Sequence, residues 1–267
     1  MTPPFDAPLW LIGCGNMGGA MLQRWIAAGA DPALVTVVTR TGANVPTGVR
    51  SLTAVPIDAE PATIVLAVKP QQLDAVVPLL AHVETPLLVS ILAGVEASAL
   101  ATRFRADAIV RAMPNLPVAI GKGVTALHTD GGDVAVRAAA TALATPLGLV
   151  EWIDGAAQFD AVTALAGCGP GFTFRFIDAL AAAGVALGLG ADQALRLATA
   201  TVEGSGAMAA RADVTPAVLA DRVASPGGST REGLNVLNAD DALVDLLTRT
   251  LAASAKRNAE MAAAARE

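Results

Sequence analysis

The residues best suited to bind a small acidic molecule lie in a glycine-rich loop in the last fifth of the chain. This loop reads Ser-Pro-Gly-Gly-Ser-Thr at 225–230, and the pattern of residues 231–237 predicts a helix directly after it. A loop that enters a helix N-terminus offers free backbone N–H groups and the positive end of the helix dipole, which together favour an anion. We therefore expect a substrate carboxylate to be bound by Gly227, Gly228, Ser229 and Thr230. The alternative is that one of the two hydroxyls simply caps the helix.

A second glycine-rich turn lies near the N-terminus and predicts a dinucleotide site. It follows the apolar run at 9–13 and opens the helical pattern at 16–28, which is the context that a G-x-G-x-x-G match requires. The first glycine permits a tight turn, the second lets a pyrophosphate approach the backbone, and the third allows close packing of helix on strand. The residues expected at the cofactor here are Ile12, Gly13, Cys14, Gly15, Asn16, Met17 and Gly18.

The end of the second predicted strand favours NADPH over NADH. An NAD-binding site usually places an acid about 20 residues after the glycines, where the carboxylate holds the ribose 2′-hydroxyl. The corresponding segment at 37–41 reads Val-Val-Thr-Arg-Thr and contains no acid. Arg40 suits a 2′-phosphate, and the alternative is a solvated surface arginine. NADH therefore stays possible.

Three further strand ends are expected on the ligand-facing edge of the sheet. Strand-terminal turns without a ligand would look similar, so these assignments depend on the dinucleotide site itself. The residues expected at the nicotinamide side are Ala67, Val68, Lys69, Pro70, Ile91, Leu92 and Ala93, with Asn115 in a comparable position.

The supply of proton donors restricts the reaction. A hydride acceptor usually needs an acid to protonate the atom left behind. His82 and His128 both lie in the first half of the chain, and Lys256 is the only lysine in the second half. A histidine-type hydroxy-acid dehydrogenase is therefore disfavoured, as is a β-hydroxyacid dehydrogenase, which uses a lysine in an early helix of its second domain. A cyclic imine needs no strong acid because it is already protonated near neutral pH, and the Thr230 hydroxyl could contact its ring nitrogen as the catalytic group.

The order of apolar runs predicts an α/β fold with two domains. Residues 1–154 are expected to form a Rossmann-like doubly wound parallel sheet, and residues 155–267 an all-α dimerisation and substrate domain. Predicted strands cover 9–13, 35–39, 64–68, 87–92 and 109–112, with further candidates at 123–127 and 149–153, and predicted helices cover 16–28, 71–80, 97–105 and Val134–Ala144. Predicted helices of the second domain cover 159–165, 172–187, 191–210 and 239–264, with breaks at 167–171, 188–190 and 225–230.

Composition excludes several classes of function. Hydrophobic residues make up 54% of the 267, but charges, glycines and prolines interrupt every apolar run before it reaches the length of about 18 residues that a membrane helix needs. A net charge of −6 argues against nucleic acid or an anionic membrane as partner. Two cysteines and two histidines predict neither a disulfide framework nor a metal site, and we expect a cytoplasmic protein.

Taken together, the motifs resemble the pyrroline-5-carboxylate reductase family over nearly the whole chain. The glycine-rich segments in the second half are more specific than the fingerprint near the N-terminus. The motifs are GCGNMG at 13–18, AVKP at 67–70, RAMPNLP at 111–117, GKGVTAL at 121–127, FDAVTALAGCGPGF at 159–172, GVALGL at 184–189 and SPGGST at 225–230.

This resemblance implies NAD(P)H-dependent reduction of 1-pyrroline-5-carboxylate to L-proline. It also implies a homodimer through the helical domain, often assembled into larger rings, and a role for Thr230 at the bound imino acid. Three positions depart from the family pattern: Cys168 and Phe172 stand where serine and tyrosine are common, and Arg231 stands where an apolar or small residue is more usual. The alternatives are a reductase of a related cyclic imino acid and a non-catalytic nucleotide-binding relative.

Overall fold

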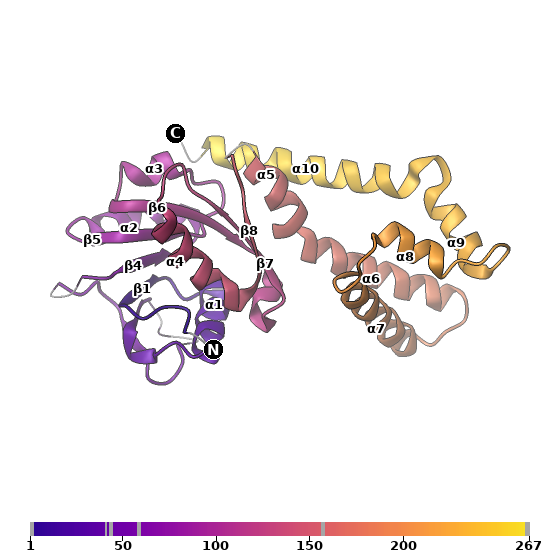
Figure 1. Ribbon diagram of the computed structural model, residues 1–267, viewed down its shortest axis with the longest axis horizontal. Helices are drawn as coiled ribbons and strands as arrows, with labels where there is room; N and C mark the ends of the chain where they lie inside the picture. The colour runs from indigo at the N-terminus through magenta and orange to yellow at the C-terminus, as the bar shows by residue number, and fades with distance from the viewer. Residues whose placement is uncertain (1–2, 41, 43–44, 58–59, 156–157, 265–267) are drawn as a thin grey trace. The chain divides into compact units, whose positions relative to one another are not determined.

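The chain forms two compact units, and each is described here by itself. The computed structural model describes residues 3–40, 42, 45–57, 60–155 and 158–264 (Figure 1). The first unit comprises Met1–Cys168 together with Ser254–Glu267, and the second comprises Gly169–Ala253.

The first unit is built on an eight-stranded sheet whose order is β3-β2-β1-β4-β5-β6-β7-β8. The strands from β3 to β6 are mutually parallel, β7 runs antiparallel to β6, and β8 is parallel to β7. Their bounds are β1 Leu9–Ile12, β2 Val35–Val38, β3 Arg50–Leu52, β4 Thr63–Leu66, β5 Glu84–Ser90, β6 Arg105–Pro114, β7 Gly123–His128 and β8 Gly148–Trp152.

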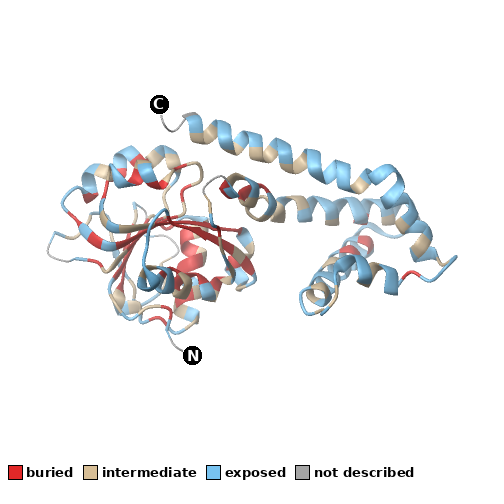
Figure 2. Cartoon of the chain, turned by 45° about the horizontal axis from the view of Figure 1, so that its top comes forward, coloured by how far each residue is buried: buried red, intermediate tan, exposed pale blue. Residues whose placement is uncertain are grey.

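Helices cover both faces of this sheet, as the alternation of side chains in β1 requires. Leu9 and Leu11 pack with helices α1 (Asn16–Ala27) and α4 (Val134–Ala144) in one buried cluster. Trp10 and Ile12 pack with α2 (Leu73–Leu80) and α3 (Ala97–Ala101) in another. Successive residues of a strand face opposite sides, so a strand that is buried on both faces is apolar at every position. Figure 2 shows these central strands buried.

The predicted doubly wound layout is confirmed, with three differences in the sheet. The three residues of β3 are not an apolar run, so this edge strand was not predicted. Strand β6 extends from Arg105 to Pro114, well beyond the predicted 109–112. The two candidate strands after it are present, but β7 reverses direction, so the sheet is not parallel throughout.

Short helices connect or extend the main ones. These are the 3₁₀ segments η1 Pro32–Leu34, η2 Pro70–Gln72, η3 Leu116–Ile120, η4 Thr145–Leu147 and η7 Ala239–Asp241, the helix α5 Phe159–Val162, and the π-helical turn η6 Thr163–Gly167.

The second unit is helical, as predicted, but its helices differ in detail. Helix α6 begins at Gly169, so the predicted break at 167–171 is reduced to Cys168, between η6 and α6; Pro170 is tolerated because it occupies the first turn of that helix. Helix α8, a seven-residue segment, was not predicted, although Thr215 caps it and Pro216 opens it. The helices are α6 Gly169–Ala186, α7 Ala191–Ala209, α8 Pro216–Arg222, α9 Ser229–Asn238 and α10 Ala242–Ala264.

The compact units divide the chain later than the expected domain boundary at 154/155. The reason is that the segment after β8 packs on the sheet: Phe159 and Ile153 share a buried cluster with Met113 and Ala126. Residues up to Cys168 are therefore held by the first unit. Cys168 itself accepts a hydrogen bond from the Ser254 hydroxyl at 3.2 Å, also within that unit.

The helical unit leaves most of its apolar side chains uncovered. The residues of 169–253 that are buried are four alanines: Ala181, Ala194, Ala198 and Ala224. Many of its large apolar side chains are 38–89% exposed, among them Phe174, Phe176, Leu187, Leu195, Leu197, Val236 and Val244. An exposed apolar surface of this extent marks a protein–protein interface. Within the described residues, no helix is both long and apolar enough to cross a membrane.

Candidate cofactor and substrate sites

The glycine fingerprint lies at the topological switch point of the sheet. Strand β1 is hydrogen-bonded to β2 on one side and to β4 on the other, so the turn after Ile12 opens where the strand order reverses. The turn is tied to both neighbours, since the Gly13 N–H donates to Val38 O at 2.9 Å and the Ala67 N–H donates to Ile12 O at 2.8 Å. Ligands of open α/β sheets bind in the crevice at this point.

The three glycines of the fingerprint have different reasons for being glycine. Gly13 has φ +95°, and a Cβ there would lie 2.8 Å from the Ala67 carbonyl oxygen. A Cβ on Gly18 would lie 2.8 Å from the Gly13 carbonyl oxygen. A Cβ on Gly15 would meet no atom within 4 Å. The chain's own packing thus requires the first and third glycines, whereas the second leaves open space where the predicted pyrophosphate would approach.

The N-terminus of α1 is free to bind that pyrophosphate. Gly15 is the N-cap and supplies no side-chain cap, and the first turn of the helix contains no acid. The first helical hydrogen bond runs from Gly19 N–H to Gly15 O at 2.8 Å. The preceding amides of Asn16, Met17 and Gly18 therefore have no acceptor within the described structure and can serve an anion. Burial raises the pKa of the Cys14 thiol, which keeps this side chain uncharged beside the site.

The other residues predicted at the cofactor follow the C-terminal ends of their strands. Arg40 is exposed just after β2, and Lys69 is exposed after β4 at the start of η2. Ile91 and Ala93 follow β5 and are partly exposed, while Leu92 is only 3% exposed and packs in the core. Any contact of Leu92 with a cofactor would therefore come from its backbone.

Asn115 is buried, and its side chain is used within the protein. Its amide nitrogen donates to Ala166 O at 2.9 Å, and its amide oxygen accepts from the Val124 N–H at 2.8 Å. The first bond ties the end of β6 to the π-helical turn η6, and the second ties it to β7. The predicted cofactor contact at Asn115 thus competes with a clear structural role, which sequence reasoning missed.

Sequence reasoning also missed a buried polar group on one face of β6, β7 and β8. Arg111 and His128 are directly paired across β6 and β7, and they are 7% and 3% exposed. The Arg111 guanidinium lies 3.8 Å from the centroid of the Phe159 ring. Burial lowers the pKa of Arg111, while the carboxylates of Glu96, Asp160 and Asp130 act in the opposite direction.

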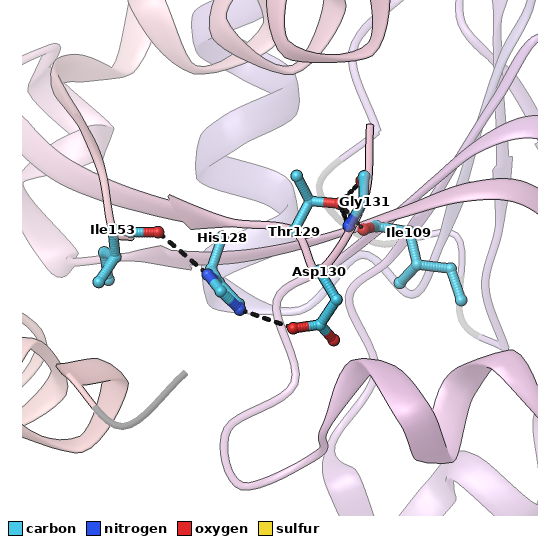
Figure 3. A network of polar contacts seen from close by, with 6 residues as sticks. All are labelled: Ile109, His128, Thr129, Asp130, Gly131 and Ile153. Atoms are coloured by element: carbon cyan, nitrogen blue, oxygen red, sulfur yellow. Dashed lines mark hydrogen bonds and ion pairs between the residues drawn. The ribbon is translucent and has the colours of Figure 1, made fainter. Parts of the chain in front are cut away.

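The His128 ring bridges two segments of the chain (Figure 3). Its Nδ1 lies 3.0 Å from Ile153 O, and its Nε2 lies 3.1 Å from Asp130 Oδ1. The Thr129 hydroxyl donates to Ile109 O at 2.8 Å and also contacts Gly131 O. These bonds join β6, the end of β7 and the residue after β8, so the group stabilises the far edge of the sheet.

The predicted substrate loop enters α9, and neither of its hydroxyls caps that helix. Gly228 is the N-cap, and the side chains of Ser229 and Thr230 form no hydrogen bond with the described residues. The interpretation that Ser229 or Thr230 merely caps the helix is therefore wrong. Both residues are exposed, so their hydroxyls and the amides of the first turn are available to a ligand.

The two glycines of this loop shape it in different ways. Gly227 has φ +69°, a backbone conformation that favours glycine. The Gly228 N–H donates to Ser225 O at 3.0 Å. Contrary to our expectation, this amide is therefore not free to bind a carboxylate. A Cβ on Gly228 would lie 2.6 Å from the Ser225 hydroxyl oxygen. The backbone N–H groups available to a carboxylate are therefore those of Ser229, Thr230 and Arg231, and not that of Gly228.

Comparison with known proteins shows which family has this sequence and fold. The curated pyrroline-5-carboxylate reductase of Pseudomonas aeruginosa is 34% identical to the chain over 265 residues, which covers 94% of this chain and 95% of that protein. The chain belongs to the pyrroline-5-carboxylate reductase family. Two family models agree: "Pyrroline-5-carboxylate reductase dimerisation" matches residues 156–261, and "NADP oxidoreductase coenzyme F420-dependent" matches residues 9–94.

Solved structures of pyrroline-5-carboxylate reductases have the same fold. The Coxiella burnetii protein gives a TM-score of 0.85 at 29% identity and covers 96% of this chain and 99% of its own. The Plasmodium falciparum pyrroline carboxylate reductase, solved with NADP bound, gives a TM-score of 0.80 at 25% identity over 96% of this chain and 98% of its own.

Substitution of the fingerprint glycines should separate cofactor binding from folding. Gly15→Ala adds a methyl group where the protein has open space, so the free energy of unfolding should change by less than about 0.5 kcal/mol. The same methyl group should raise the KM for NADPH by at least about tenfold, or ~1.4 kcal/mol of binding free energy. Gly13→Ala is the contrasting variant, because its positive φ and its contact with Ala67 should destabilise the fold by about 1–2 kcal/mol. Urea unfolding and steady-state kinetics measure the two effects; an unchanged KM in Gly15→Ala would contradict the assignment.

Proposed function

We propose that the protein reduces 1-pyrroline-5-carboxylate to L-proline with NADPH, the final step of proline biosynthesis. The observation that carries the proposal is the 225–230 loop of this family member, which presents free amides and two unengaged hydroxyls at the start of α9. A carboxylate beside a ring nitrogen matches these donors. A protein that only sensed nucleotide would have no use for them.

The reaction needs little acid catalysis from the chain. When NADPH is bound, it supplies a hydride to the ring carbon of the protonated imine, and the C=N bond becomes the C–N bond of proline. The first-turn amides of α9 hold the substrate carboxylate, and the Thr230 hydroxyl accepts or donates a hydrogen bond at the ring nitrogen. Because the substrate enters as an iminium ion, no side chain has to deliver a proton before hydride transfer. This fits a helical unit that contains no histidine.

The proposed cofactor preference for NADPH depends on Arg40. This exposed residue follows β2, the strand whose end usually carries the ribose-binding acid in NAD-dependent proteins. Its guanidinium can form charge-assisted hydrogen bonds with a 2′-phosphate, which NADH lacks. NADH should therefore remain a usable but poorer donor.

The active form is proposed to be a homodimer through the helical unit, with dimers further assembled into a ring. The exposed apolar side chains of α6, α7, α9 and α10 need a partner, and the dimerisation model matches the same part of the chain. We place the reaction in the cytoplasm, because NADPH is available there and because two cysteines are too few for a disulfide framework.

The first test is turnover of the purified protein with 1-pyrroline-5-carboxylate. We expect oxidation of NADPH, followed by its absorbance, to be faster than oxidation of NADH, and the five-membered ring to be preferred over the six-membered imino acid. Faster turnover of the six-membered ring would assign the protein to a related reduction. NADPH binding without turnover of either ring would favour a regulatory relative and contradict the proposal.

Replacement of Thr230 tests the catalytic assignment. Thr230→Val keeps the shape of the side chain and removes its hydroxyl, so the transition state should lose about 1–3 kcal/mol and kcat should fall roughly 10–100-fold. The KM for NADPH should not change. Thr230→Ser retains the hydroxyl and should keep most of the activity; a Thr230→Val enzyme with full kcat would remove Thr230 from the mechanism.

Replacement of Arg40 tests the cofactor preference. Arg40→Ala should raise the KM for NADPH by about tenfold, since one charge-assisted hydrogen bond to phosphate is lost, and should leave the KM for NADH within about twofold. Arg50→Ala is the control, because Arg50 is also exposed but lies at the opposite end of the neighbouring strand β3. Equal losses for both cofactors would contradict the 2′-phosphate role.

A further inference from the structure

We propose that Arg231 is a positioning residue: its ion pair with Asp221 holds the substrate loop in the conformation that presents Ser229 and Thr230. The inference rests on the proposed function and adds a residue that no motif of the family marks. It concerns the helical unit alone, where both partners of the ion pair lie.

The Arg231 guanidinium connects the two sides of the loop. Its Nη2 donates to Asp221 Oδ1 at 2.9 Å and to the Ala224 carbonyl oxygen at 3.1 Å. Asp221 belongs to the last turn of α8, whereas Arg231 belongs to the first turn of α9. One side chain thus spans the whole turn between the helices. The Arg231 side chain is 31% exposed and that of Asp221 is 69% exposed, so only the arginine is better shielded from water than in a pair such as Arg175–Asp178.

The rest of the loop has few bonds of its own. The Gly228 N–H donates to Ser225 O, and the Ala224 N–H donates to Asp221 O at 3.1 Å. Ser225, Pro226 and Gly227 are exposed, and Gly227 and Gly228 carry no side chain that could pack. Ala224 is the anchor, since it is 4% exposed and its carbonyl is the second acceptor of Arg231. Loss of Arg231 would leave this glycine-rich loop with these two backbone bonds and the bond from the Glu232 N–H to Gly228 O, and with a larger choice of conformations.

Order in the loop matters because Ser229 and Thr230, the proposed binding residues, lie between Ala224 and Arg231, the two residues that fix the loop. Ser229 and Thr230 directly precede Arg231, and their amides bind a carboxylate only when the first turn of α9 is formed. A disordered loop would have to be ordered by the substrate, and that cost would appear as weaker substrate binding. Cofactor binding, which uses the other unit, would not change.

The competing explanation is that Arg231 contacts the substrate carboxylate directly. A substitution of Asp221 distinguishes these two explanations. If Arg231 acts by holding the loop, Asp221→Ala should have the same effect as Arg231→Met, because either change breaks the ion pair. If Arg231 binds the substrate itself, Asp221→Ala should release the guanidinium and leave the KM for the substrate unchanged or lower.

The test compares Arg231→Met, Asp221→Ala and the double variant in steady-state kinetics. We expect each single variant to raise the KM for 1-pyrroline-5-carboxylate by about three- to tenfold, the range for one partly exposed charged hydrogen bond, with kcat within about twofold. The double variant should be no worse than either single one, because both remove the same interaction. The exchanged pair, Arg231→Asp with Asp221→Arg, should recover part of the loss. Additive effects, or an unchanged KM in Asp221→Ala, would overturn the proposal.

Amide hydrogen exchange gives a second measurement that needs no turnover. Exchange at Gly228 and Glu232, whose N–H groups bond Ser225 O and Gly228 O, should become faster in both single variants. Faster exchange in a protein that does not reduce the substrate would uphold the ion pair and contradict only the proposed function. Unchanged exchange would overturn the positioning role.

The control is Arg105→Met in the first unit. Arg105 pairs with Glu84 at 3.4 Å across β5 and β6, and both side chains are well exposed. This change removes an arginine and breaks its ion pair with a carboxylate, at a position far along the chain from the loop. It should leave the KM for the substrate and the exchange at Gly228 unchanged.

Discussion

The two proposed binding sites depend on one constraint: a helix that begins with a glycine cap has first-turn backbone N–H groups with no side-chain acceptor. Helix α1 begins after Gly15 and helix α9 after Gly228, and neither has a side-chain cap. Such a start is less stable than one with a Ser, Asp or Asn cap, by roughly a few tenths of a kcal/mol. The amides left open by this loss are the donors that an anionic ligand requires. These two helix starts are therefore the places where we propose that the cofactor pyrophosphate and the substrate carboxylate bind.

Different local interactions fix the turns that precede these two helices. At α1, the turn is fixed by backbone packing: Gly13 lies against the Ala67 carbonyl, Gly18 lies against Gly13, and the ladder bonds of β1 continue into the turn. At α9, the loop is exposed and lacks such packing, so side chains must hold it. Arg231 and Asp221 supply that function from the two flanking helices. A rigid sheet can therefore tolerate several glycines at its edge, while a loop between short helices needs a specific ion pair.

A structural feature of this protein is predictable from the sequence when neighbouring residues determine it, and not when it depends on contacts between distant residues. The buried strands were predictable, because strands covered on both faces are almost continuously apolar: Leu9–Ile12 is apolar at every position, and Val35–Val38 at every position except Thr36. The exposed edge strand Arg50–Leu52 has no such signal, and nothing in the residues of Gly123–His128 reveals that this strand runs antiparallel. The two glycine-rich turns were predictable as turns that enter helices from the types and order of their residues, and their use as ligand sites stays a prediction. The contacts of Asn115 with Ala166 and Val124 join residues up to 51 positions apart, so no local pattern could assign that side chain to the protein's own structure.

The helical unit raises a question of stability that bears on the substrate loop. Its buried residues are small alanines, and alanine contributes little free energy on burial compared with the 1.5–3 kcal/mol or so of a larger apolar side chain. The close approach of α6 and α7 at Gly184, where a Cβ would lie 3.4 Å from that of Ala194, adds contact but little buried area. Phenylalanines, leucines and valines on the outside of these helices therefore hold most of the stabilising energy available to the unit, and that energy is released only when a second surface covers them. Order in the loop between α8 and α9 then has two sources, the Arg231 ion pair within the unit and the burial that accompanies assembly. The first acts at every protein concentration, whereas the second depends on it.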